Sequence, residues 1–414
     1  MQKLEPILGK LTMNPKKVLF YSHDTLGLGH IRRTQKIAND LAGPDVAILV
    51  ICSSPKASDY RSEPGIEYLK LPGFTKLKTG AYIPRNLNVE LEEFVKLRSQ
   101  IILSAIQSFE PDVFVVDKEP LGVKGELKAG LDFIKANGGK THTICGIRDI
   151  LDKPEFIAKE WARRGSEQAL IEYYDSVIVY GDQNIYDFQK EYNFSEELNP
   201  KLHYMGYILQ NENENRQAGY QEAFEKQEDK PLVTFSLGGG EDGDDFLSVF
   251  VEAMKKYQDD INFQTLIVTG PFLSNGRYAG FCERVQGLKD LTMVNFHPDM
   301  YGILKQSDVL VTMGGYNTFC ECLSLKKQPI ILPRIRPREE QLIRAQIFKA
   351  KGLCDYIHPD ELTEDQLFAK IQEKLNSRQE GNYEFKKDGL AETVRFIRSR
   401  TQNFSPSLRV VVKG

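Results

Sequence analysis

The chain of 414 residues lacks the usual marks of membrane-spanning, secreted and nucleic-acid-binding proteins. No stretch is apolar for the roughly 18 residues that a transmembrane helix needs, so none is expected. Residues 1–17 lack the apolar core of a signal peptide. A net charge of -4 argues against nucleic acid as a partner. These absences predict a cytoplasmic protein.

Metal-binding patterns are absent as well. The 6 histidines include no HxxxH or HExxH pair, and the 6 cysteines are scattered along the chain. Cys320 and Cys322 are separated by one residue in a predicted helix, which is poor spacing for zinc. No Asp-x-Asp motif is positioned to hold a metal ion. We therefore expect no metal site, and we expect most cysteines to be buried thiols in a reducing compartment.

The chain does contain a regular alternation of apolar strands and amphipathic helices. Its length is too great for one core, and the strongly polar segment 207–230 interrupts the alternation. The pattern predicts an α/β fold with a parallel sheet wrapped by helices in each half. We expect an N-terminal domain at 1–210 and a C-terminal domain at 225–382. A C-terminal helix within about 383–414 is expected to join the N-terminal domain.

The expected elements follow from these patterns. Residues 74–86 are expected to form an irregular basic stretch. The strands are expected at 17–22, 46–52, 66–70, 112–116, 141–147, 175–180, 202–205, 232–237, 263–269, 291–296, 308–313 and 329–332. The helices are expected at 31–41, 88–109, 123–136, 154–171, 244–257, 275–286, 299–306, 341–350 and 361–375, with a last amphipathic segment at 383–400.

Gly314 and Gly315 separate one of these strands from the helix that follows it. In open parallel sheets the ligand lies at the carboxyl ends of the strands. Two glycines let the backbone approach a phosphate, and a helix N-terminus supplies N–H donors and positive potential. Glu321, further along the helix, can accept hydrogen bonds from ribose hydroxyls. The structural alternative is a plain tight turn with a solvated glutamate.

A second glycine loop, Gly238–Gly240, follows the first strand of the C-terminal half. Successive glycines free backbone N–H groups to point toward a phosphate. The acidic residues at 241–245 would repel a phosphate, and we expect them to cap the next helix instead.

In the N-terminal half, the loop 23–30 joins the first strand to the first helix and ends at His30. A helix N-terminus disfavours the imidazolium ion, which suits a neutral general base. A histidine that only caps or packs is the alternative. Asp117, Arg148 and Asp149 lie at the ends of later strands, where they could contact a substrate or pair with neighbours.

Five motifs occur together and in order: the loop ending Leu28-Gly29-His30, the glycines 238–240, the segment 295–300, the stretch 314–321 and the pair 340–341. In combination they resemble the glycosyltransferases of the GT-B fold, and most closely the MurG-like group of family 28. The longer strings SHDTLGLGHIRRT and IRDILDKPE are similar to a bacterial predicted-glycosyltransferase subgroup.

This resemblance implies two Rossmann-like domains facing a cleft. It implies that His30, or else Asp117 or Asp149, deprotonates an acceptor hydroxyl, and that Arg148 or Arg334 contacts phosphate or acceptor. The residues expected to bind the donor by this resemblance are Gly29, Gly238, Gly239, Gly240, Phe296, His297, Gly314, Gly315, Asn317, Thr318, Glu321, Glu340 and Gln341. Among them, the segment with Phe296 and His297 is implied to hold uracil, Glu321 the ribose, and Glu340 with Gln341 the donor sugar.

The reaction implied is transfer from a nucleotide-sugar, with a UDP-sugar expected, to an unknown hydroxyl acceptor on a lipid-linked molecule or glycan. Inversion at the anomeric carbon is expected, with neither a metal ion nor another cofactor. The loop with Arg334, Arg336 and Arg338 is more basic than the family pattern, and Glu340 replaces a glutamine.

Three alternatives stay open: a UDP-sugar hydrolase, a sugar-nucleotide 2-epimerase, and a non-catalytic nucleotide-sugar-binding protein. A further expectation concerns location. Apolar and basic residues at 74–85 could contact the inner face of the plasma membrane, and an ordinary solvated loop is the alternative.

Overall fold

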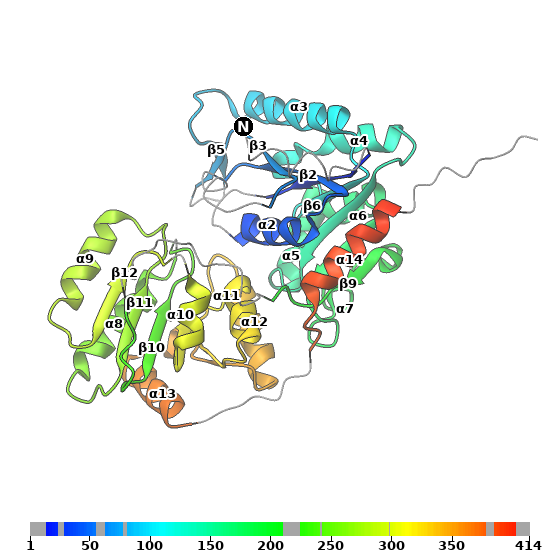
Figure 1. Cartoon of the computed structure of the whole chain (residues 1–414). Helices are drawn as coiled ribbons and strands as arrows, with labels where there is room; N and C mark the ends of the chain where they lie inside the picture. Colours follow the sequence, from blue (N-terminus) through cyan, green and yellow to red (C-terminus); the bar gives the residue numbers. More distant parts are fainter. Residues whose placement is uncertain are drawn as a thin grey trace, which may run out of the picture. The chain divides into compact units, whose positions relative to one another are not determined.

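The computed structural model describes residues 14–23, 29–54, 63–77, 81–209, 224–240, 242–297, 299–377 and 385–402. These residues form two compact units, which are described separately (Figure 1). Unit 1 is drawn from Met1–Asp149, Ala158–Tyr207 and Asp388–Gly414. Unit 2 is drawn from Ile150–Ile157 and Ile208–Lys387.

Unit 1 is built on a sheet of seven strands, all of whose pairings are parallel. Their order across the sheet is β3-β2-β1-β6-β7-β8-β9. The strands are β1 (Lys16–Tyr21), β2 (Val46–Cys52), β3 (Ile66–Lys70), β6 (Val113–Asp117), β7 (His142–Arg148), β8 (Ser176–Tyr180) and β9 (Leu202–Tyr204). Apolar runs such as VFVV in β6 form central strands because helices cover both faces of a parallel sheet.

The helices of this unit follow the strands in alternation. They are α2 (Gly29–Leu41), α3 (Leu91–Phe109), α4 (Lys128–Ala136), α5 (Pro154–Arg164), α6 (Ser166–Tyr173), α7 (Phe188–Tyr192) and α14 (Gly389–Gln402), with short 3-10 turns η2 (Val123–Gly125) and η3 (Glu196–Lys201). The start of α5, up to Ile157, groups with unit 2, although the N-terminal domain was expected to be continuous over 1–210. The C-terminal helix α14 packs on α2, where Arg398 donates a hydrogen bond to the Leu41 carbonyl at 2.7 Å. Figure 1 shows α14 in red beside the strands of unit 1.

Unit 2 repeats the same topology with six strands. The order is β12-β11-β10-β13-β14-β15, again with parallel pairings throughout. The strands are β10 (Leu232–Ser236), β11 (Gln264–Val268), β12 (Leu291–Val294), β13 (Val309–Thr312), β14 (Ile330–Ile331) and β15 (Asp355–Tyr356). The helices are α8 (Asp244–Lys256), α9 (Asn275–Val285), α10 (Met300–Gln306), α11 (Tyr316–Ser324), α12 (Glu340–Ala350) and α13 (Glu364–Asn376), with the 3-10 turn η4 (Pro359–Glu361).

In both sheets the order of the strands reverses at one point. In unit 1, β2 and β3 follow β1 in order toward one edge of the sheet. The next strand, β6, pairs with the other side of β1. In unit 2 the same reversal occurs at β10 and β13. Ligands of doubly wound sheets bind at such switch points, outside the carboxyl ends of the strands. The prediction of two Rossmann-like units is confirmed, and the topology marks one ligand-binding edge in each.

Three local expectations were wrong. The helix expected at 154–171 is broken into α5 and α6 by Gly165, whose φ of 63° is left-handed. The helix expected at 123–136 is the turn η2 followed by α4. The stretch 74–86 is not irregular, because β4 (Phe74–Lys76) and β5 (Tyr82–Pro84) pair as an antiparallel hairpin.

The hairpin also changes the expected membrane-contact surface. Phe74 is fully buried and packs edge-on against Phe94 of α3, so its ring is not available to a membrane. Arg85 donates a hydrogen bond to the Phe74 carbonyl at 2.9 Å. Leu77 and Ile83 are exposed, and Lys78 lies outside the described residues. Contact with a membrane stays a prediction, now limited to the exposed residues of this hairpin.

Within the described part of the chain, no helix combines the length and the apolar character needed to cross a bilayer.

Candidate functional site

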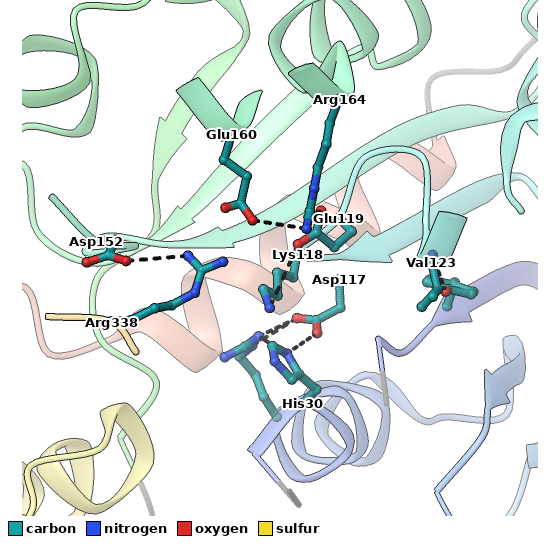
Figure 2. A network of polar contacts seen from close by, with 11 residues as sticks. His30, Asp117, Lys118, Glu119, Val123, Asp152, Glu160, Arg164 and Arg338 are labelled. Carbon is teal, nitrogen blue, oxygen red and sulfur yellow. Dashed lines mark hydrogen bonds and ion pairs between the residues drawn. The ribbon is translucent and has the colours of Figure 1, made fainter. Parts of the chain in front are cut away.

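The switch point of unit 1 brings together His30 and Asp117. His30 lies in the first turn of α2, the first helix after β1 among the described residues, and Asp117 is the last residue of β6. Because β1 and β6 are neighbours in the sheet, their carboxyl ends meet. His30 Nδ1 lies 2.6 Å from Asp117 Oδ2, and Figure 2 shows the two side chains directed toward each other.

The pairing assigns the tautomer of His30. A carboxylate only accepts hydrogen bonds, so Nδ1 of a neutral His30 carries the hydrogen and donates it to Asp117. The Arg33 Nη2, 3.2 Å from the same nitrogen, is then a neighbour of Nδ1 and not its donor. The lone pair of His30 is left on Nε2, the atom that could accept a proton from a substrate.

Arg33 holds the other oxygen of Asp117. It stands three residues after His30, on the same face of α2, and both its Nε (3.2 Å) and its Nη2 donate to Asp117 Oδ1. Its guanidinium carbon lies 4.9 Å from the ring centroid of Tyr180 at the end of β8. Tyr180 fits because β7 has glycine at Gly146, where a Cβ would stand 2.3 Å from the Tyr180 hydroxyl. Strand packing therefore positions the arginine that positions the aspartate.

Burial and the neighbouring charges together set the protonation states of Asp117 and His30. Burial raises the pKa of the Asp117 carboxyl, but Arg33 and His30 outweigh burial and hold that pKa below its usual range. Burial lowers the pKa of His30 to about 4, although the Asp117 carboxylate opposes this shift. At pH 7 the cluster thus holds an ionised aspartate, a charged arginine and a neutral imidazole, the protonation state that a general base requires.

We expect the free energy of unfolding to fall on mild acidification because of His30. The unfolded chain takes up a proton at a histidine pKa of about 6.5, whereas folding holds the His30 pKa at about 4. Between these values the unfolded state binds more protons, so lowering the pH favours unfolding. At pH 5.5 this one group costs about 1.4 kcal/mol.

Urea unfolding at pH 7.5 and pH 5.5 measures the effect. His30→Gln should lose less stability between the two pH values than the wild type does, because the variant has no imidazole to protonate. Equal losses in the two proteins would contradict the low pKa of His30.

A second group of charges surrounds the end of β6. Arg164 of α5 pairs with Glu119 and with Glu160, each at 3.0 Å, and Lys118 Nζ lies 3.8 Å from Glu119. Figure 2 shows this network next to Asp117. Lys118 has a φ of 72°, a left-handed conformation that costs a non-glycine residue roughly 1–2 kcal/mol. Such strain is typical of functional sites.

His23, two residues after β1, packs against His30. Their rings are perpendicular, with centroids 5.7 Å apart. His23 is buried, and neither ring nitrogen has a hydrogen-bond partner among the described residues. Burial, with Lys118, holds its pKa well below the usual range, so it adds no charge at neutral pH.

Two other predicted residues lie apart from the pair. Asp149 is fully buried and accepts a hydrogen bond from the Tyr207 hydroxyl at 2.8 Å. Arg148 ends β7 and is partly exposed. Among the described residues, neither contacts His30. Gly29 is the first residue of α2, immediately before His30. The three candidate bases are His30, Asp117 and Asp149. His30 has a ring nitrogen, Nε2, that can accept a proton while Asp117 accepts the hydrogen bond from its Nδ1.

The switch point of unit 2 brings the two glycine turns together. Gly238–Gly240 follow β10, and Gly314 and Gly315 follow β13, its neighbour in the sheet. A Cβ at Gly238 would lie 4.0 Å from Thr318 Oγ1 in the first turn of α11. Gly240 has a φ of 85°, and a Cβ there would stand 2.4 Å from the Thr269 carbonyl oxygen. The loop can therefore lie this close to the Thr269 backbone only with glycine at this position.

The N-terminus of α11 is open. Gly315 is its N-cap and provides no side-chain cap, and a Cβ at Gly315 would meet no atom within 4 Å. The first N–H groups of the helix therefore have no side-chain acceptor at the cap position. Asn317, Thr318 and Glu321 are partly exposed and fall on one face of α11 by their spacing of three and four residues.

The predicted sugar-contacting residues form a polar cluster at the start of α12. Arg334 donates to Glu340 Oε1 at 2.5 Å and to Asp242 Oδ2 at 2.6 Å, and its backbone N–H donates to Gln341 Oε1 at 2.9 Å. Asp242 thus anchors an arginine, which accounts for an acidic residue beside a glycine loop. Glu340 and Gln341 are both buried.

The predicted base-binding residues follow β12 at the edge of the sheet. Phe296 is 42% exposed, and His297 is buried with its Nδ1 accepting a hydrogen bond from the Asp299 backbone at 3.2 Å. An exposed phenylalanine next to a strand end offers an aromatic face for stacking.

Three residues of these sites were missed by sequence reasoning: Arg33, Tyr180 and Arg344. Arg33 could have been flagged by its position three residues after His30. Arg344 of α12 is 1% exposed, and it stands among the buried positions of its helix. A charged residue at a core position of an amphipathic helix is a signal that the sequence already carries.

Known proteins resemble this chain in sequence and in fold. Residues 234–398 match the profile of the glycosyltransferase family 28 C-terminal domain. An uncharacterised glycosyltransferase of Methanosarcina acetivorans is 24% identical over 347 residues, covering 81% of this chain and 85% of the relative. The crystal structure of MurG from Acinetobacter baumannii superimposes with a TM-score of 0.56 at 12% identity, covering 94% of this chain and 99% of that one.

A shorter match carries a more detailed name. A UDP-N-acetylglucosamine–N-acetylmuramyl-(pentapeptide) pyrophosphoryl-undecaprenol N-acetylglucosamine transferase of Shouchella clausii is 33% identical over 85 residues, 20% of this chain and 24% of the relative.

Two doubly wound units with this family profile define an enzyme class: the chain is a glycosyltransferase with the GT-B fold. Part of the chain is similar in sequence to the family 28 transferases, as its motifs indicated, and its fold is similar to that of MurG.

Proposed function

We propose that this glycosyltransferase transfers a sugar from a UDP-sugar to a hydroxyl group of its acceptor, with inversion and without a metal ion. Unit 1 binds the acceptor and unit 2 binds the donor. The observation that carries the proposal is the hydrogen bond from His30 to Asp117, which leaves His30 Nε2 as a neutral base at a ligand-binding edge. The Shouchella clausii relative, named for a UDP-N-acetylglucosamine donor, supports uridine as the base.

The proposed chemistry is a single displacement. His30 Nε2 takes the proton of the acceptor hydroxyl, and the acceptor oxygen forms a bond to the anomeric carbon of the sugar. The bond from that carbon to the β-phosphate oxygen breaks, and UDP leaves with the electron pair. Attack opposite the leaving group inverts the anomeric carbon. Asp117 stabilises the imidazolium that forms on His30.

The leaving diphosphate needs positive potential. The open N-terminus of α11 and the exposed backbone of Gly239 would supply N–H donors for it, whereas the Gly238 N–H donates to Ser236 Oγ at 3.3 Å. Dipoles of this kind stabilise the charge that develops in the transition state, the role that a metal ion has in other transferases. Glu321 would hold the ribose hydroxyls, and Phe296 would stack on the base.

A thermal-shift panel of UDP-, GDP-, dTDP- and CDP-sugars tests the donor. We expect stabilisation by uridine nucleotides, because a ligand at 100 times its dissociation constant adds about 2.7 kcal/mol to the free energy of unfolding. Glu321→Ala should lose most of this shift. Glu373→Ala, an exposed glutamate paired with Lys370 on α13, is the matched control and should keep it.

The outcomes separate the alternatives. Stabilisation by another nucleotide would replace uridine in the proposal, and no shift with any of them would remove the donor assignment. UDP release that never depends on an added acceptor would indicate a hydrolase. EDTA should leave both the shift and the rate unchanged, and a loss in EDTA would contradict transfer without a metal ion.

A further inference from the structure

Arg344 of α12 is a buried cation that has no counter-charge among the described residues. Its side chain is among the largest fully buried ones, at 1% exposure. One hydrogen bond is made, from Nη1 to the Gly314 carbonyl oxygen at 3.2 Å, and the guanidinium carbon lies 5.8 Å from the Tyr316 ring centroid. Within the described residues, Nε and Nη2 have no acceptor and no carboxylate forms an ion pair with this arginine.

The other arginines that are buried in the described residues each have a carboxylate partner. Arg98 in unit 1 is 2% exposed, and two of its nitrogens donate to the Glu126 carboxylate. Arg33, the other buried arginine among the described residues of unit 1, has Asp117. A buried charge without a partner carries a large free-energy cost and is normally avoided. Among the described residues no carboxylate offsets this cost for Arg344, and a bound anionic group would offset it.

The position of Arg344 identifies where that group binds. Gly314, whose carbonyl accepts its hydrogen bond, precedes Gly315, the uncapped N-terminus of α11. A cation bound to the Gly314 carbonyl polarises the Gly314–Gly315 peptide and strengthens its N–H as a donor. The space at Gly315 is open. The buried positive charge and the helix N-terminus therefore add their potentials at the same two-glycine turn.

We propose that Arg344 is a positioning residue that provides the counter-charge for the diphosphate of the donor, acting through the Gly314–Gly315 peptide. This inference rests on the proposed function for the identity of the nucleotide, but its charge argument requires only a diphosphate. Negative charge on the diphosphate increases as the bond to the sugar breaks. Arg344 should thus affect kcat at least as strongly as the binding of the donor.

Calorimetric titration of the full chain with UDP, uridine and inorganic pyrophosphate tests the inference. Arg344→Met keeps an apolar side chain of similar length and removes the charge. We expect the affinity for UDP and for pyrophosphate to fall by about 10- to 100-fold, with uridine affinity unchanged. Arg344→Lys should keep most of the affinity. Arg277→Met, at an exposed arginine paired with Asp244, is the control and should match the wild type.

A structural role predicts different results. If Arg344 only holds the fold, Arg344→Met should unfold at lower temperature without ligand and weaken uridine as much as UDP, and either result overturns the inference. Removal of an unpaired buried charge should instead leave the ligand-free protein at least as stable as the wild type. Unchanged affinity for both UDP and pyrophosphate also overturns it. If pyrophosphate binds in a way that depends on Arg344 but UDP does not bind, this inference stands. The same result excludes a uridine nucleotide as the donor in the proposed function.

Discussion

Replacement of His30 by alanine is expected to lower kcat by about 10²- to 10⁴-fold, the usual contribution of a general base. The Michaelis constant for the donor should change little, since His30 belongs to unit 1 and the expected donor residues, apart from Gly29, belong to unit 2. The physical reason is the loss of Nε2, the atom that takes the acceptor proton while Asp117 holds Nδ1. UDP release in the presence of an acceptor found by screening measures both constants.

A second histidine provides the matched control. His358, in unit 2, caps the turn η4 through its Nδ1 and lies outside both sites. His358→Ala should leave kcat near the wild-type value. If His30→Ala and His358→Ala have the same kcat, His30 is excluded as the base. Other groups at the end of β6 would then be the candidates.

Replacement of Asp117 by alanine is expected to reduce the free energy of unfolding by about 3–5 kcal/mol. The variant leaves Arg33, itself buried, without the carboxylate that accepts hydrogen bonds from its Nε and Nη2. The pKa of Asp117 is held below its usual range by Arg33 and His30, so the carboxylate is ionised and the charge pair is complete in the wild type at neutral pH. Urea unfolding at pH 7.5 measures the loss.

Two variants make this prediction specific. Asp132→Ala removes an exposed carboxylate paired with Lys128 at 2.8 Å and should cost at most about 1 kcal/mol. Arg33→Met combined with Asp117→Ala should recover most of the stability, because no buried charge is then left unpaired. A loss in Asp117→Ala no larger than that in Asp132→Ala would contradict this account of the site.

The periodicity of the sequence was sufficient to predict most helices and strands, because apolar runs and apolar stripes are local properties of the chain. It failed at Gly165, where a single left-handed residue divides a continuous apolar stripe into α5 and α6. It also failed at Phe74, whose basic and polar neighbours indicated a surface loop. A hairpin pairing and the ring of Phe94 bury it instead.

The positions of the glycine turns and of His30 after strands could be predicted, because the strands before them are apolar runs in the sequence, and their role in a site stays a prediction. Their partners could not be predicted. Asp117 is 87 residues from His30 along the chain, and Arg344 is 30 residues from Gly314. Nothing in the spacing of these residues indicates that they meet, and Asp149 was an equally good candidate in the sequence.

The sequence by itself determined the alternation of strands and helices, the two glycine turns and the presence of a histidine at the first helix. The tertiary structure decided which charges meet. Strand order places the ends of β1 and β6 together and the ends of β10 and β13 together, and so pairs His30 with Asp117 and one glycine turn with the other. The reason is physical: local propensity acts over a few residues, whereas the partner of a buried charge is set by packing between segments distant in the chain.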